Sequence, residues 1–142
     1  LYNIRYCSKK KHFRLTGPTR CSGRVEVFFN SSWGTVCDDG WDLTDAAVVC
    51  RLLGCGLPQT ALSGAHFGEG TGQIWLSNVG CSGLEDTLTE CSHSGFGINS
   101  CGHAQDAGVI CGKFLYTSLT RTRPEISFSY GGKPTNNETC LV

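Results

Sequence analysis

The stretch Cys37-Asp-Asp-Gly-Trp-Asp-Leu-Thr-Asp-Ala-Ala-Val-Val-Cys50-Arg-Leu-Leu-Gly-Cys55 decides the fold, because it places three cysteines and four aspartates around one short amphipathic segment. Its apolar residues recur at helical spacing, which predicts a helix over 45–53. Asp42 or Thr44 is expected to cap the start of this helix, and Gly54 is expected to end it. Cysteines at both ends indicate disulfide tethers, and the aspartates at the start favour a cation.

The cysteine content predicts the compartment. Ten cysteines in 142 residues indicate a disulfide scaffold formed in an oxidising environment. Asn30 and Asn137 each begin an N-glycosylation tripeptide, which is consistent with secretion. No apolar run approaches the roughly 20 residues that a membrane span needs, so no membrane insertion is expected in this segment. The chain starts at Leu1 with no signal-peptide pattern, which favours a mature chain or an excised fragment.

A net charge of zero conceals a strong asymmetry along the chain. Residues 1–24 hold seven cations and no acid, whereas residues 25–112 hold ten acids and one cation, Arg51. Residues 113–142 hold four cations and two acids. Two interpretations follow: the acids form an ordinary solvated surface, or they cluster around a bound cation.

Composition divides the chain into three parts: a basic leader over 1–12, a folded domain over 13–112, and an extension over 113–142 to which no role is assigned. Within the domain, a turn is predicted at Gly17-Pro18 and a hairpin turn at 30–32. Ser82 and Glu85 have the spacing of a capping box that opens a short helical turn through Cys91. Strands are predicted over 13–15, 24–28, 33–36, 74–76 and 107–111.

The ordered cysteines can now be compared with a known pattern. The comparison rests on the stretch 37–55 and on Trp33-Gly-Thr-Val-Cys37, Val79-Gly-Cys81-Ser-Gly-x-Glu85, Asp106-Ala-Gly-Val-Ile-Cys111, Cys21, Cys91 and Cys101-Gly-His103. In these residues the chain closely resembles a scavenger receptor cysteine-rich domain of the eight-cysteine type (group B). The resemblance covers about 13–112. It implies an α+β fold in which a curved β-sheet cradles one main α-helix, with a short helical turn in addition.

Eight cysteines allow 105 pairings, which sequence reasoning alone cannot reduce to one. The family resemblance implies the pairs Cys21–Cys55, Cys37–Cys101, Cys50–Cys111 and Cys81–Cys91. Cys7 and Cys140 lie outside the family pattern. We predict that they pair with each other and join the two flanks; the alternative is that each bonds a partner chain.

The resemblance also implies a Ca²⁺ site, with Mg²⁺ as an alternative ion, formed by Asp38, Asp39 and Glu85. Hard cations prefer carboxylate oxygens, and few lysines or arginines lie nearby in sequence to neutralise these acids. The competing interpretations are a capping role for Glu85 and a solvated turn for the two aspartates. A second, weaker site would use Asp45 and Asn78, although Asp45 also fits the role of a helix first-turn acid.

A further candidate for ligand contact lies on the predicted hairpin. Arg24, Val25, Glu26, Val27 and Trp33 resemble a bacteria-binding stretch known in repeats of this family. The alternative is that Val25, Val27 and Trp33 are core residues, and the alternation of apolar positions favours this alternative.

Zinc binding and catalysis are not expected. The chain has no Cys-x₂-Cys pair, and the thiols of a secreted chain oxidise. It also lacks a Gly-x-Ser-x-Gly elbow, a His-Glu-x-x-His motif and a phosphate loop. The basic leader could contact polyanions, but a solubilising or processing role explains it as well, and nucleic acid is not the expected main partner.

The sequence therefore predicts a non-catalytic extracellular binding module, either secreted or part of a membrane protein. Its expected partners are anionic glycans, bacterial surface components and extracellular glycoproteins, with Ca²⁺ bridging two negative surfaces. Repetition of the domain would raise avidity. The alternatives are a metal-independent protein-interaction module and an accessory domain of a larger secreted enzyme.

Overall fold

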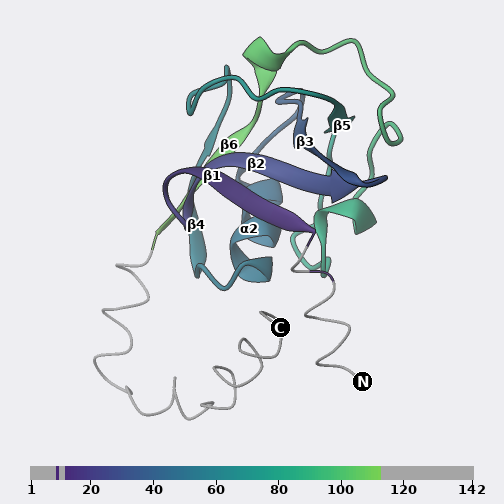
Figure 1. The fold of residues 1–142 in the computed structure, drawn as a ribbon. Helices are drawn as coiled ribbons and strands as arrows, with labels where there is room; N and C mark the ends of the chain where they lie inside the picture. Colours follow the sequence, from purple (N-terminus) through teal and green to yellow (C-terminus); the bar gives the residue numbers. More distant parts are fainter. Residues whose placement is uncertain (1–8, 10–11, 113–142) are drawn as a thin grey trace, which may run out of the picture.

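A computed structural model of the chain describes Lys9 and residues 12–112 (Figure 1). The Cys7–Cys140 pairing, the Asn137 tripeptide, the extension over 113–142 and nearly all of the basic leader lie outside the described residues. In the part of the chain that the structure describes, no helix is both long and apolar enough to cross a membrane.

One curved sheet of six strands forms the body of the domain (Figure 1). Its main path runs β4-β6-β2-β3-β5, and β1 pairs with β2 off this path. The β2 strand is central because β1 pairs along its length, β6 pairs with its first half and β3 with its second half. The strands are β1 (Phe13–Thr19), β2 (Ser22–Phe29), β3 (Ser32–Val36), β4 (Leu57–Leu62), β5 (Ile74–Leu76) and β6 (Gly108–Gly112).

The predicted hairpin is confirmed. A two-residue turn joins β2 to β3, and both of its residues have positive φ, 51° at Asn30 and 67° at Ser31. Positive φ at both central positions defines a type I′ turn, whose twist matches that of the flanking strands. Phe29 therefore pairs directly with Ser32.

The strands differ from the prediction at two places: one predicted turn is wrong, and one strand was missed. The turn at Gly17-Pro18 is absent, because both residues continue β1, which shifts register between Thr16 and Thr19. The backbone of Gly17 approaches that of Gly23 so closely that an added Cβ atom would lie 2.5 Å from the Gly23 Cα atom. The strand β4 was not predicted; its proline, Pro58, lies at a register irregularity on an edge strand, where a missing N–H is tolerated.

The main helix, α2, spans Leu43–Leu52 and begins two residues before the predicted start. Asp42 is its N-cap, and its carboxylate accepts hydrogen bonds from the backbone N–H groups of Thr44 and Asp45. The Asp45 side chain accepts in return from the Asp42 N–H, which completes a capping box. Gly54 follows the helix with a φ of 71°, as expected of a residue that ends one.

Short helical turns lie at Leu88–Glu90 and His103–Gln105. The predicted turn ending at Cys91 therefore starts at Leu88 and not at Ser82. Only one half of the predicted capping box forms: the Glu85 carboxylate accepts from the Ser82 N–H, but the Ser82 hydroxyl accepts from the Leu84 N–H and not from that of Glu85. They close a loop instead of opening a helix.

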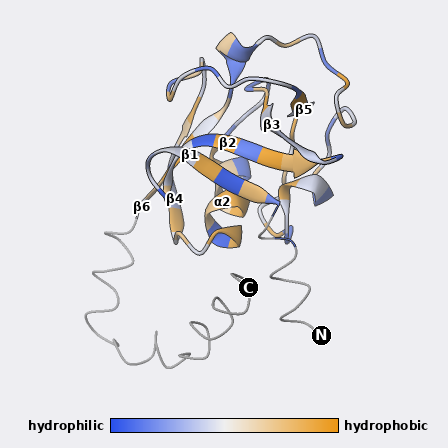
Figure 2. Cartoon of the chain, viewed as in Figure 1, coloured by the Kyte–Doolittle hydropathy of each residue, from blue (hydrophilic) through white to orange (hydrophobic). Residues whose placement is uncertain are grey.

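The core lies between α2 and the sheet, and hydrophobic residues occur along both α2 and the strands (Figure 2). Val25 and Val27 point into it from β2, and Ala46, Val49 and Leu52 from α2. Four disulfides join the elements: Cys21–Cys55, Cys37–Cys101, Cys50–Cys111 and Cys81–Cys91. These are the four pairs that the family resemblance implies. Cys50–Cys111 connects α2 directly to β6.

Candidate ligand-binding surface

The first acidic segment is the turn that follows β3. Asp38 is fixed at its backbone, because its N–H donates to the Gln105 carbonyl and its own carbonyl accepts from the Trp41 N–H. Gly40 turns the chain with a φ of 74°. The Asp38 carboxylate accepts a hydrogen bond of 2.7 Å from the Gly64 N–H. The Cys37–Cys101 disulfide anchors this turn to the loop before β6.

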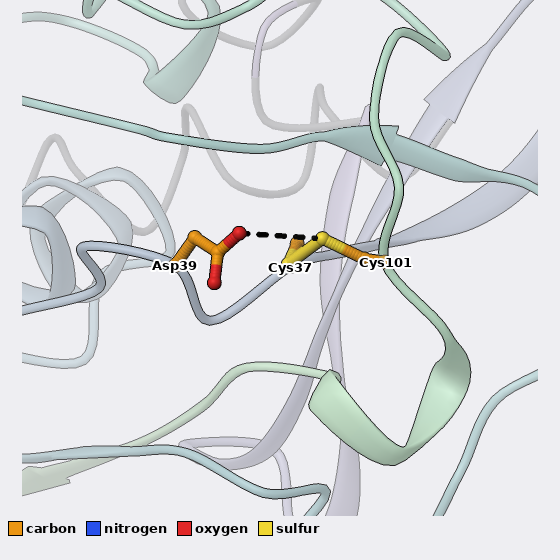
Figure 3. A group of neighbouring side chains, drawn as sticks. All are labelled: Cys37, Asp39 and Cys101. Atoms are coloured by element: carbon orange, nitrogen blue, oxygen red, sulfur yellow. Dashed lines mark hydrogen bonds between the residues drawn. A yellow bond between two sulfur atoms is a disulfide. The ribbon is translucent and has the colours of Figure 1, made fainter.

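Asp39 is exposed beside that disulfide (Figure 3). Its Oδ2 atom lies 3.7 Å from the Cys101 Sγ atom. The sulfur carries no proton in a disulfide, so this contact is not a true hydrogen bond. The amide of Gln105 approaches the Oδ1 atom at a long 3.4 Å. The Asp39 carboxylate is therefore weakly held and open to an external partner.

Glu85 lies in the second acidic segment, a loop between Cys81 and Cys91. Its carboxylate accepts from the N–H groups of Ser82 and Gly83 at 2.9–3.1 Å. The bond from Ser82 is the main reason that the pKa of Glu85 lies below its usual value. The charged carboxylate is thus held in place before any ligand arrives, by the bond that a capping box would use, although no helix starts here.

The helix α2 contacts both acidic segments, and it holds the second one through Asp45 in its first turn and Arg51 in its last turn. The Asp38–Gly40 turn leads directly into it. The Asp45 carboxylate reaches out to accept from the Cys81 N–H at 2.9 Å. Arg51 donates its guanidinium to the carbonyls of Gly83 and Glu85. The one cation of residues 25–112 therefore positions the Glu85 loop through its backbone and makes no ion pair with the described carboxylates.

The structure does not gather the three predicted Ca²⁺ ligands into one group. Among the described residues, three potential ligand atoms lie within 4.8 Å of one another at Cys37, Asp39 and Cys101, and at Cys81, Glu85 and Cys91. In each group the two sulfurs form a disulfide, and a disulfide sulfur is not the thiolate that binds metals. Each group thus offers a single carboxylate, and Asp38 belongs to neither.

The two residues of the second predicted site have other roles. Asp45 is fully buried, and its carboxylate oxygens accept from the N–H groups of Asp42 and Cys81. Asn78 is exposed, and its amide donates to the Ser94 hydroxyl. Asp45 therefore acts as the first-turn acid of α2, which was the alternative to metal binding.

The burial of Asp45 has a consequence for the pH dependence of stability. Burial raises its pKa to about 6, from 3.8 for an ordinary aspartate. The folded state therefore holds a proton that the unfolded state releases, so stability falls as the pH rises from about 4 to about 6. We therefore expect the free energy of unfolding of the native chain to fall relative to that of Asp45→Asn as the pH rises through this window. Urea denaturation of both chains at a series of pH values measures it. A constant difference from pH 4 to 7 would show that Asp45 does not titrate there.

The candidate contact residues on the hairpin divide by face. Val25 and Val27 are 0% and 1% exposed, so their prediction as ligand contacts is wrong: both belong to the core. Glu26 and Arg24 point to the opposite side of β2. Glu26 accepts from Arg14 on β1 and from Arg24, and Arg14 also lies over the Trp33 ring, 4.0 Å from its centroid. Arg24, Glu26 and Trp33 thus belong to a polar cluster on the outer face.

Sequence reasoning missed this cluster as a unit. Arg14 and Glu26 are twelve positions apart in the chain, and only the β1–β2 register makes them direct partners. The outward alternation of Arg24, Glu26 and Phe28 was visible in the sequence, but the register that adds Arg14 was not.

A second polar cluster on this face contains Thr35, His103 and Asp106. It lacks the geometry of a catalytic relay, because the Thr35 hydroxyl and the Asp106 carboxylate both contact the same Nδ1 atom of His103. A relay needs the nucleophile and the acid on opposite ring nitrogens. The His103 Nε2 atom instead pairs with the Gly72 carbonyl, so the cluster ties the loop before β5 to the turn before β6.

A curved sheet around one disulfide-tethered helix, with charged loops at its surface, defines a small disulfide-stabilised α+β domain. The chain belongs to the scavenger receptor cysteine-rich domain family, whose sequence model matches residues 15–112. Domains of this family are extracellular ligand-binding modules of receptors.

Individual relatives agree with this assignment. A scavenger receptor cysteine-rich domain superfamily protein of Patiria pectinifera is 52% identical over 95 residues, which cover 67% of this chain and 8% of that relative. The third such domain of murine neurotrypsin is 50% identical, with a TM-score of 0.64 over 70% of this chain and 94% of the other. The domain of mouse MARCO, solved in a dimeric form, is 48% identical, with a TM-score of 0.61 over 70% and 93%. The chain thus spans a small part of the Patiria pectinifera protein.

Proposed function

We propose that this domain binds anionic extracellular ligands through a Ca²⁺ ion held by Asp38, Asp39 and Glu85. The ligands would be sulfated or phosphorylated glycans, bacterial surface components or glycoproteins of an extracellular setting. We also assign the domain to the eight-cysteine subgroup, nearest in pattern to the repeats of the secreted mucosal protein salivary agglutinin, which would place it in innate immunity.

The observation that carries the proposal is the absence of a cationic partner for these acids. Among the described residues, Lys9, Arg14, Arg24 and His103 make the ion pairs, and none of them pairs with Asp38, Asp39 or Glu85. An anionic ligand approaching this surface would be repelled, so a divalent ion is the simplest link between the two. The three side chains would have to converge on the ion, and the contacts that exposed Asp39 would give up are the weakest of the three.

Calcium titration of the chelator-treated full chain by calorimetry tests the site. We expect saturable binding with a dissociation constant of about 0.1–1 mM, the range of extracellular calcium modules. The Asp39→Ala variant should bind at least about tenfold more weakly, whereas Glu69→Ala, which removes an exposed acid elsewhere, should bind as the native chain does. An absence of saturable binding up to about 5 mM Ca²⁺, or equal loss in both variants, would contradict a site at Asp39.

A metal-independent protein interface is the second candidate. It is favoured by the hydrogen bonds that the Asp38 and Glu85 carboxylates already accept from backbone N–H groups, since these bonds would compete with an ion for the same oxygens. Binding of a sulfated glycan to the full chain, measured with Ca²⁺ and with chelator, separates the two candidates. Binding that survives chelation and Asp39→Ala favours the metal-free interface. An accessory role in a larger secreted enzyme would leave either mode of binding unchanged.

A further inference from the structure

The side chain of Asn30 in the β2–β3 turn is exposed and is held by no hydrogen bond to a described residue. Asn30, Ser31 and Ser32 are all exposed, and the Asn30 amide makes no hydrogen bond to any described residue. The three residues form the tripeptide that oligosaccharyl transfer requires. The type I′ geometry places Asn30 at the tip of the hairpin, where an extended enzyme site can reach it.

An aromatic surface lies directly beside this turn. Phe29 precedes Asn30, and its ring stacks on Phe96 with a centroid separation of 3.8 Å and an angle of 4° between the planes. The Trp75 ring packs against Phe29 in an edge-to-face arrangement, with 5.1 Å between the two ring centroids. Phe29 is still 36% exposed, and both phenylalanines line a cleft of about 410 Å³. Three aromatic rings thus fix an apolar surface that no described residue covers completely.

We propose that Asn30 carries an N-linked glycan whose first N-acetylglucosamine packs on the exposed part of Phe29. In the transfer step, the Asn30 side-chain nitrogen attacks the anomeric carbon of an oligosaccharide linked through pyrophosphate to a polyprenol lipid. A C–N bond forms, the C–O bond to pyrophosphate breaks, the lipid pyrophosphate leaves, and the amide nitrogen loses one proton.

The first sugar is the natural occupant of this surface because of its tether. Phe29 and Ser32 are direct cross-strand partners, so their side chains lie on the same side of the hairpin. A sugar on Asn30 is held within reach of that side. The C–H groups on one face of a pyranose complement the electron-rich face of an aromatic ring. Because the sugar is already attached, packing costs little translational freedom.

This glycan would leave the proposed calcium site accessible. Asn30 precedes β3, whereas Asp38 and Asp39 follow its other end. The five residues of β3 separate the two ends by about 17 Å. The proposal is therefore independent of the proposed function, and either can fail alone.

The test uses the full chain with Asn137→Gln, secreted from cells that attach only high-mannose glycans, so that Asn30 is the only glycosylation tripeptide. Intact-mass measurement gives its occupancy. Endoglycosidase treatment then trims the glycan to one N-acetylglucosamine. We expect most chains to be modified, and the trimmed form to unfold about 4 °C above the unglycosylated Ser32→Ala variant, a shift typical of a modest local gain in a domain of this size.

The Phe29→Leu variant is the matched control, because leucine remains apolar but lacks the flat ring. The glycan-dependent shift should disappear in this background, and Phe96→Leu serves the same purpose if Phe29→Leu does not fold. Two results would overturn the proposal: an unmodified Asn30, or a shift of the same size without the aromatic pair.

Discussion

Replacement of Glu26 by alanine is expected to destabilise the domain by about 3 kcal/mol, the low end of the cost of removing one partner from a buried ion pair. The Glu26 side chain is 8% exposed, and it accepts from Arg14 at 2.7 Å and from Arg24 at 2.8 Å. Burial raises the pKa of Glu26, but the hydrogen bonds from Arg24 and Arg14 outweigh burial and hold the pKa below its ordinary value. Without this carboxylate, two guanidinium groups would face each other across the strands.

The two arginines differ in exposure, and replacement of the more exposed one, Arg14, is the control for Glu26→Ala. The Arg14 side chain is 49% exposed, whereas that of Arg24 is 13% exposed. Exposed ion pairs contribute at most about 1 kcal/mol, so Arg14→Ala should cost about 1 kcal/mol, including its contact with Trp33. Urea denaturation of the three chains gives the comparison. A Glu26→Ala chain no less stable than Arg14→Ala would show that the cluster contributes only as a surface ion pair.

Removal of the Cys50–Cys111 disulfide by a double alanine substitution is expected to cost about 4 kcal/mol. This bond closes a loop of 61 residues, and the chain entropy released in the unfolded state grows with loop length. Because small domains are stable by only about 5–15 kcal/mol, this loss leaves the domain near its unfolding threshold. Both cysteines are buried, so a small packing loss adds to the entropic one.

The Cys81–Cys91 bond provides the contrast, because it closes only 10 residues. Its double alanine variant should lose about 3 kcal/mol. Urea denaturation of both variants ranks the two bonds. The opposite order would mean that the Glu85 loop depends on its disulfide for more than loop closure.

Local patterns in the sequence predicted much of the fold. The spacing of Ala46, Val49 and Leu52 predicted α2, and the alternation of Val25 and Val27 with the turn at Asn30 predicted the β2–β3 hairpin. These elements were predictable because the interactions that define them lie within a few residues. The strand β4 was not predicted, because it is defined by its pairing with β6, some fifty residues further along the chain.

The candidate site divides in the same way. The sequence predicted which residues could supply carboxylates, since Asp38, Asp39 and Glu85 stand without nearby cations. It could not predict that Asp45 is buried as a cap between Asp42 and Cys81, because both bonds depend on how the Cys81 loop meets α2.

By itself, the sequence determined the disulfide-rich character, the amphipathic helix, the hairpin and the acidic character of the domain, while the cysteine pairs came from the family resemblance. The tertiary structure decided which charges meet. Strand register brings Arg14 and Arg24 onto Glu26, the packing of α2 turns Asp45 inward, and the hairpin places Phe29 beside both Asn30 and Phe96. The physical reason is that propensity and periodicity act over a few neighbouring residues, whereas burial and ion pairing depend on contacts between distant segments that exist only after the chain has folded.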